Sequence, residues 1–209
     1  MWFILIILIG VGGFYMFKMW KSLQEPKDVK DEKFTPYSKE ELRIENVGPG
    51  GVIQLNTVGP DMEDFDVNIM AKHVYREGGD TWHELEGESG TRKVWIELEE
   101  GDELDVSITL RKLKLSDISL NKKELQRIDD DKEGEFTFEG QKYSYDDSGE
   151  ATFLRHSEQS NAEKVYYWDF ESDDEEHMIS VEKWEDASYD VSYSEYIKSS
   201  QIKVYSLKT

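Results

Sequence analysis

The amino-acid sequence predicts an all-β protein with one N-terminal transmembrane helix. The predicted β region has two related antiparallel lobes, each a sandwich or a partly open barrel, joined by a short helical connector. Three observations lead to this prediction. No charged side chain precedes Lys18, polar and apolar residues alternate in many short segments after residue 51, and turn-forming residues separate these segments. Alternation with a period of two is typical of strands that bury one face, and many short strands at close spacing are typical of sandwiches and barrels.

Residues 1–20 are predicted to be a transmembrane anchor in contact with the lipid bilayer. The segment from Trp2 to Trp20 would form a helix of about 28 Å, close to the ~30 Å hydrocarbon core of a membrane. A cleaved signal peptide is the alternative, but such a peptide carries a basic residue before its apolar core and small residues after it. The side chains expected to face lipid are Trp2, Phe3, Ile4, Leu5, Ile6, Ile7, Leu8, Ile9, Val11, Phe14, Tyr15, Met16, Phe17 and Trp20.

Residues 21–38 are predicted to be a charged linker between the anchor and the β region. Lysines follow the apolar segment, at Lys18, Lys21 and Lys27, and only the terminal amine precedes it. Basic residues stay on the cytoplasmic side of a membrane segment. We therefore expect a single-pass protein of the cell membrane whose soluble domain faces the cytoplasm.

The β region is predicted to contain a first lobe at residues 39–118, a helical connector at 119–131 and a second lobe at 132–209. Apolar residues of the connector recur at the spacing of one helix face. A degenerate repeat supports the two lobes, because the hairpin that begins at Trp82 resembles the hairpin that begins 86 residues later at Trp168. Each lobe alone would be small, so we expect the two to share an interface.

Short aromatic segments recur in both predicted lobes. They are Gly79-Asp80-Thr81-Trp82-His83-Glu84, Val94-Trp95-Ile96-Glu97, Phe138-Glu139-Gly140-Gln141-Lys142-Tyr143, Tyr166-Tyr167-Trp168-Asp169-Phe170 and Ile179-Ser180-Val181-Glu182-Lys183-Trp184. In combination, over roughly residues 44–206, these segments resemble the bacterial domain-of-unknown-function 4178 family. The resemblance implies a shared fold and a bacterial origin. It carries over no catalytic residues, and it implies an association with envelope or membrane-stress systems.

The composition restricts the classes of partner. The net charge is −21, and the acidic residues follow the anchor. Such a field repels phosphates, which excludes a general nucleic-acid binder and favours basic proteins, polyamines or metal cations, although solubility alone also explains it. The chain has no cysteine, which excludes disulfides, zinc–thiolate sites and cysteine nucleophiles.

No catalytic motif is present, so the candidate site residues come from the aromatic and acidic strand positions. Four histidines lack the spacing of metal ligands, and the acidic runs lack the alternation of a calcium loop, so we predict no cofactor and no metal. Tryptophans can stack on a ligand or line a groove, although the matched repeat positions of Trp82 and Trp168 favour core packing for these two. The candidate ligand-binding residues are Trp82, Glu84, Trp95, Trp168 and Trp184.

Two functions are consistent with these features. The first is a membrane-anchored, non-catalytic interaction or scaffold protein that binds a protein partner or forms homo-oligomers through sheet edges or its acidic face. The alternative is a domain that binds a small ligand, a sugar or a cation, or a hydrolase, with a site between the lobes. A deep aromatic pocket with converging carboxylates would favour the alternative, whereas filled lobe interiors would favour the scaffold.

Overall fold

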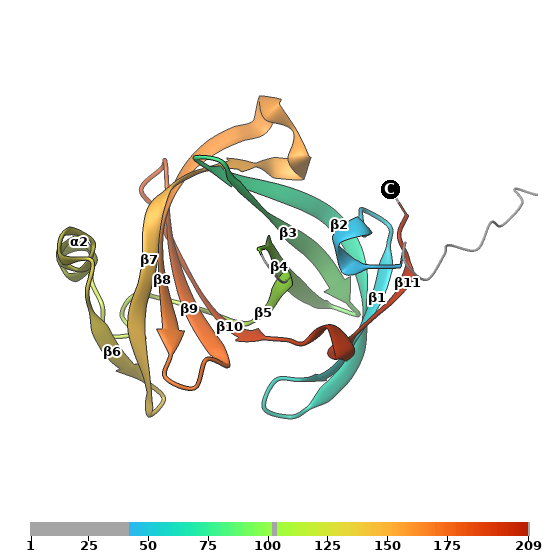
Figure 1. Cartoon of the computed structure of the whole chain (residues 1–209), viewed down its shortest axis with the longest axis horizontal. Helices are drawn as coiled ribbons and strands as arrows, with labels where there is room; N and C mark the ends of the chain where they lie inside the picture. The colour runs from blue at the N-terminus through green and yellow to red at the C-terminus, as the bar shows by residue number, and fades with distance from the viewer. Residues whose placement is uncertain (1–41, 102–103, 209) are drawn as a thin grey trace, which may run out of the picture. The chain divides into compact units, whose positions relative to one another are not determined.

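A computed structural model describes residues 42–101 and 104–208, which form eleven strands and one α-helix (Figure 1). The all-β prediction is therefore confirmed for the described residues. The predicted transmembrane helix and linker lie outside them, and no helix within 42–101 or 104–208 is long and apolar enough to cross a membrane. The elements are β1 (Val52–Val58), β2 (Glu63–Glu77), β3 (Asp80–Ser89), β4 (Arg92–Glu100), β5 (Leu104–Leu113), α2 (Lys122–Asp131), β6 (Glu135–Phe138), β7 (Gln141–Leu154), β8 (Ala162–Ser172), β9 (His177–Trp184), β10 (Tyr189–Tyr196) and β11 (Ile202–Ser206), with short 3-10 turns at Ile44–Asn46, Arg155–Ser157, Gln159–Asn161 and Ser199–Gln201.

All the strands belong to one antiparallel sheet, in the order β11-β1-β2-β3-β4-β5-β10-β9-β8-β7-β6. β2 also pairs with β7, where Val74, Tyr75 and Arg76 lie opposite Leu154, Phe153 and Thr152. This extra pairing closes the strands from β2 to β7 into a ring, and β1, β11 and β6 extend beyond it (Figure 1). The predicted lobes are thus joined by hydrogen-bonded strands, β5 to β10 and β2 to β7.

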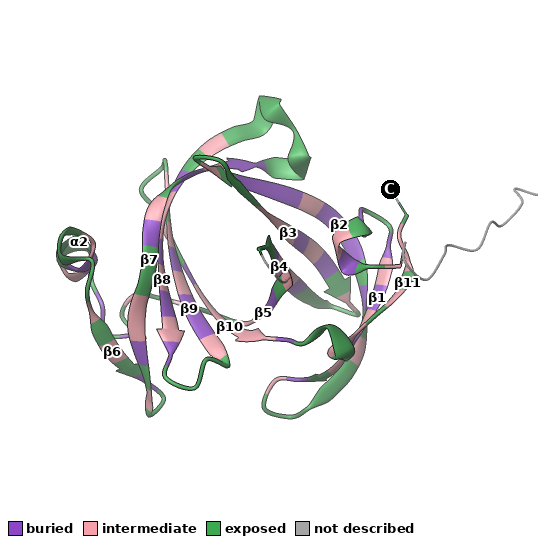
Figure 2. Ribbon diagram, in the orientation of Figure 1, coloured by how far each residue is buried: buried purple, intermediate pink, exposed green. Residues whose placement is uncertain are grey.

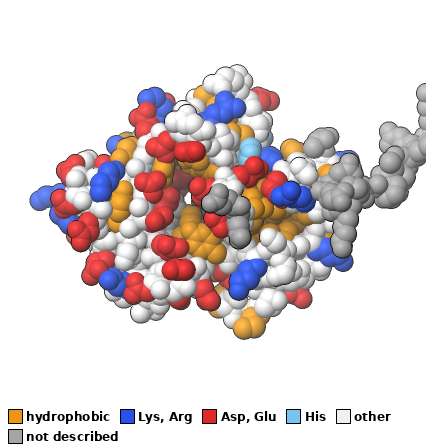
Figure 3. Space-filling view, in the orientation of Figure 1, with side chains coloured by type: hydrophobic (Ala, Val, Ile, Leu, Met, Phe, Trp, Pro, Cys, Tyr) orange, Lys and Arg blue, Asp and Glu red, His pale blue; other side chains and the backbone are white. Residues whose placement is uncertain are grey.

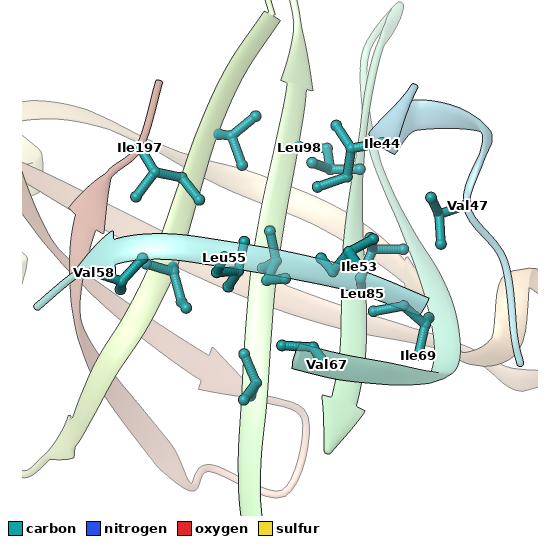
Figure 4. Close-up of a cluster of buried hydrophobic side chains, with 14 residues drawn as sticks. Ile44, Val47, Ile53, Leu55, Val58, Val67, Ile69, Leu85, Leu98 and Ile197 are labelled. Carbon is teal, nitrogen blue, oxygen red and sulfur yellow. The ribbon is translucent and has the colours of Figure 1, made fainter. Parts of the chain in front are cut away.

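Two hydrophobic clusters lie on the outer face of this ring. The first is formed mainly by β1 to β5 and includes Ile53, Leu55 and Leu85 (Figure 4). The second lies between α2 and the strands β6 to β10, and includes Leu125 and Phe170. Buried residues alternate mostly with residues of intermediate exposure along the strands that form both clusters (Figure 2). The opposite face of the same strands therefore points into the ring.

The C-terminal strand departs from the predicted lobe boundaries. β11 pairs with β1, and Ile202 and Val204 pack against the first cluster, although the sequence placed residues 132–209 in the second lobe. An edge strand such as β1 exposes unpaired backbone groups, and a further strand satisfies them. Periodicity alone does not show which strand will do so.

The connector forms α2, within the predicted range of residues 119–131. Asn121 caps the helix by accepting hydrogen bonds from the backbone N–H groups of Lys123 and Glu124, and the Glu124 side chain accepts from the Asn121 backbone in return. This reciprocal cap satisfies donors that every helix start leaves open. Leu125 and Ile128 are buried, and they anchor the helix on the second cluster.

Candidate functional site

The inner face of the ring is acidic and aromatic because of strand alternation. In the β3–β4 pair, Glu84 lies opposite Glu97, and Trp82 lies opposite Glu99. Their neighbours, such as Leu85, belong to the first hydrophobic cluster on the other face. Successive side chains of a strand point to opposite faces, so burying Leu85 outside the ring directs these carboxylates inside it.

The facing wall is built in the same way by β8 and β9. Tyr167 lies opposite Glu182, and Asp169 lies opposite Ser180. The alternate residue Trp168 is buried in the second cluster. Figure 3, which looks down the ring, shows Asp and Glu side chains around a central hollow in which hydrophobic side chains are visible.

One cavity in the ring, which we call the acidic cavity, has a volume of about 130 Å³. It is lined by three aromatic rings, those of Tyr75, Trp82 and Tyr167, and no Lys, Arg or His is among its lining residues. A volume of this size corresponds to a few water molecules at ~30 Å³ each. The carboxylates that line it are Glu97, Glu99, Asp146, Asp147, Asp169 and Glu182.

A second, larger space, which we call the open cavity, has a volume of about 460 Å³ and shares Tyr75 and Glu182 with the first. It contains Glu84, Trp95 and Trp184. Unlike the acidic cavity, it also contains basic side chains: Lys112, which lies over the Trp95 ring at 5.2 Å, and Arg155, which pairs with Glu163 at 3.3 Å.

Few hydrogen bonds satisfy the polar groups inside the ring. The Tyr75 hydroxyl donates to Oε1 of Glu182 at 2.9 Å, and the Tyr167 hydroxyl donates to Glu77 and, at 3.2 Å, to Oδ2 of Asp147. In contrast, Oδ1 of Asp169 is buried without a hydrogen-bond partner, as is the indole N–H of Trp184 in the open cavity. Buried polar groups in proteins are nearly always paired, so unpaired ones indicate a missing partner.

The pKa values of the inner carboxyl groups are raised. Burial raises the pKa of Glu84 and of Asp169 to about 7, and the neighbouring Glu182 adds to the shift in both. Burial, together with Asp169, Glu84 and Glu182, raises the pKa of Glu97 well above its usual range. The pKa of Glu182 is also raised by burial, against the opposing effects of Lys112 and Tyr75. Titratable groups perturbed in this way cluster at functional sites.

The inner carboxylates are too far apart to surround one metal ion. Among residues 42–101 and 104–208, the one group of three such side chains with ligand atoms within 4.8 Å of one another is Asp174, Glu176 and His177. This trio lies at the β8–β9 turn, where both acidic residues are exposed, and exposed acidic groups of this kind are common without an ion. The carboxylates inside the ring instead form an extended series.

Four of the five candidate residues from the sequence line the cavities: Trp82, Glu84, Trp95 and Trp184. Trp168 does not, because it packs beside Tyr166 in the second cluster. The repeat aligned Trp168 with Trp82, but strand alternation puts its neighbours Tyr167 and Asp169 inside the ring.

Sequence reasoning missed several inner residues. Glu97, Glu182, Tyr75 and Asp169 are not among the candidates that the sequence provides, although all four line the acidic cavity. His73 is 2% exposed, accepts a hydrogen bond from the His156 backbone at 3.0 Å and lies 3.6 Å from Glu86. The signal in the sequence that could have found them is the alternation in β3, β4, β8 and β9, where acidic and aromatic residues alternate with mostly apolar ones.

The family model for the domain of unknown function DUF4178 matches residues 57–199, more than half of the chain. The chain belongs to this family. The resemblance of its aromatic segments is thereby confirmed, and the match includes every strand of the ring. A search of curated proteins and a search of solved structures found no match to this DUF4178 chain.

Proposed function

We propose that this domain binds a small organic cation inside the ring of strands. The acidic cavity carries the proposal: six carboxylates and three aromatic rings line it without a basic side chain, and one buried carboxylate oxygen of Asp169 has no partner. An unpaired carboxylate in a buried site is unfavourable. A protonated amine supplies both the opposite charge and N–H donors, and aromatic faces attract it further.

The other ligand classes fit this cavity less well. Calcium and magnesium need a compact shell of oxygens, whereas the inner carboxylates are spread along the ring. A neutral sugar could stack on Trp82, but it would leave the carboxylates without a counter-charge. An anion would meet only repulsion, since the lining of the acidic cavity has no basic group.

We further propose that residues 1–20 hold this binding domain at a membrane, with the domain on the cytoplasmic side. The uncharged segment Met1–Phe17 and the lysines that follow it support the proposal. The strands β6 and β11 end the sheet, and such edges suit a protein partner or a second copy of the chain. Fractionation of cells that express residues 1–209 or 39–209, with reporter fusions to the C-terminus, tests the anchor and its orientation.

Isothermal titration calorimetry on the full-length chain tests the binding proposal. At about pH 8, above the pKa of about 7 of Glu84 and Asp169, we expect butylamine (1-aminobutane) to bind and its uncharged counterpart butanol not to bind. Glu97→Gln should abolish or strongly weaken amine binding, because it removes charge from the acidic cavity. Glu150→Gln is the matched control, since Glu150 is exposed on β7 and pairs with Lys164 at 2.6 Å. Absence of amine binding by the natural chain would reject the proposal.

A further inference from the structure

We propose that the natural ligand is a linear polyamine that contacts both cavities at once, with one ammonium group in the acidic cavity and another in the open cavity. This inference rests on the proposed function, and it adds the ligand class and the binding mode.

The two cavities are neighbours that share part of their lining. Tyr75 and Glu182 line both, and their 2.9 Å hydrogen bond connects β2 to β9 between them. Glu84 and Glu97 lie opposite each other in the β3–β4 pair, yet Glu84 lines the open cavity and Glu97 lines the acidic cavity. A ligand at this boundary therefore meets carboxylates on both sides.

The spacing of these carboxylates matches a chain of amines. Directly opposed residues of two antiparallel strands have Cβ atoms about 5 Å apart, and residues two apart on one strand are separated by about 6.6 Å. Glu84 and Glu97 have the first relation, and Glu84 and Glu86 have the second. With bonds of about 1.5 Å, three or four methylene groups separate two nitrogens by roughly 5–6 Å.

Aromatic side chains at the boundary provide a surface for the methylene groups between the nitrogens. The Tyr75 ring is stacked on Trp82, with centroids 5.3 Å apart, and lies 4.8 Å from the Phe153 ring. Phe153 in turn meets Trp184 edge to face at 5.2 Å. Alternating carboxylates and apolar rings therefore complement alternating ammonium and methylene groups.

Lys112 gives an internal precedent for an ammonium group in the open cavity. Its Nζ lies over the Trp95 ring at 5.2 Å, and its charge lowers the pKa values of both Glu84 and Glu182. The acidic cavity has no equivalent lysine among its lining residues. A polyamine nitrogen would supply the corresponding charge there.

Calorimetry with 1-aminobutane, 4-amino-1-butanol, 1,4-diaminobutane and spermidine on the full-length chain tests the inference. We expect 1,4-diaminobutane to bind about tenfold more tightly than 1-aminobutane, the effect of one further charge-assisted contact, and spermidine to bind more tightly still. Glu84→Gln should lower the affinity for the diamine more than that for the monoamine, so that the tenfold difference between them is lost. Glu97→Gln should weaken both ligands, and Glu150→Gln neither.

The outcomes separate this inference from the proposed function. Equal affinities for 1-aminobutane and 1,4-diaminobutane would overturn the two-point mode while leaving cation binding intact. A 4-amino-1-butanol affinity equal to that of the diamine would also overturn it, because the second contact would then be a hydroxyl beside the unpaired Trp184 indole. Displacement of the diamine by equimolar calcium would reject the ligand class. Binding of none of the amines would reject the proposed function itself.

Discussion

The carboxylates of Asp129 and Asp169, both in this acidic domain, differ in the hydrogen bonds that their oxygens accept. Asp129, on α2, accepts hydrogen bonds at one oxygen from Ser148 at 2.6 Å, Tyr166 at 2.8 Å and Lys132 at 2.9 Å. Asp169, on β8, has a buried oxygen with no partner. The first carboxylate joins the helix to β7 and β8, whereas the second contributes nothing comparable to the fold. The difference supports the proposal that the inner carboxylates bind a ligand.

The pKa values of the two groups move in opposite directions. Burial would raise the pKa of Asp129, but the hydrogen bonds from Ser148, Lys132 and Tyr166 outweigh it and lower the pKa. Burial raises the pKa of Asp169 to about 7, and only Ser180 opposes it. Ionisation therefore stabilises the fold at Asp129 and destabilises it at Asp169.

Replacing Asp129 should have the largest effect on stability. Asp129→Ala removes three hydrogen bonds and leaves Ser148 and Tyr166 without their acceptor, so we expect the free energy of unfolding to fall by about 2–3 kcal/mol. Urea unfolding measures this fall in the free energy of unfolding. Asp130→Ala is the control on the same helix, because Asp130 is exposed and its one side-chain hydrogen bond is to Gln126. Equal losses in both variants would contradict the role of Asp129.

Neutralising an inner carboxylate should have a smaller effect of the opposite sign. Glu97→Gln keeps the shape of the side chain and removes a carboxyl group that Asp169, Glu84 and Glu182 repel when it ionises. We expect the free energy of unfolding of the ligand-free chain to rise by about 1 kcal/mol, because site residues are often kept at the expense of stability. A loss of stability in thermal unfolding would show that Glu97 is structural.

The ligand-free chain should be more stable at mildly acidic pH than at pH 8. Between their usual pKa values and about 7, the Glu84 and Asp169 carboxyls bind protons in the folded state but not in the unfolded state. The free energy of unfolding should therefore rise as the pH falls from about 7.5 to 5. Amine affinity should fall over the same range, since protonation removes the negative charge.

Melting temperatures across this pH range, measured with and without 1,4-diaminobutane, test both trends. Glu84→Gln should flatten the stability profile of the ligand-free chain, and Glu150→Gln should leave it unchanged. A natural chain that becomes less stable from pH 7.5 to 5 would contradict the assignment of raised pKa values to the inner carboxyls.

The smallest effect is expected for the boundary between the cavities. Tyr75→Phe removes the hydroxyl that donates to Glu182 but keeps the ring stacked on Trp82. We expect a change in stability of no more than about 1 kcal/mol, the typical net contribution of one hydrogen bond. Amine affinity should change by less than about threefold. A larger loss of binding would make the hydroxyl itself a ligand contact.

The sequence alone determined the β class, the connector helix and the family, because alternation, helix spacing and aromatic segments are local properties. It also selected Trp82, Glu84, Trp95 and Trp184 as site residues. Only the tertiary structure decided that the inner faces of the strands line the interior of a ring instead of facing bulk solvent. It also decided that Trp168 lies outside the ring and that β11 pairs with β1. A period of two shows that a strand has two different faces. Which distant strands pair, and what each face then meets, depends on contacts between residues far apart in the chain.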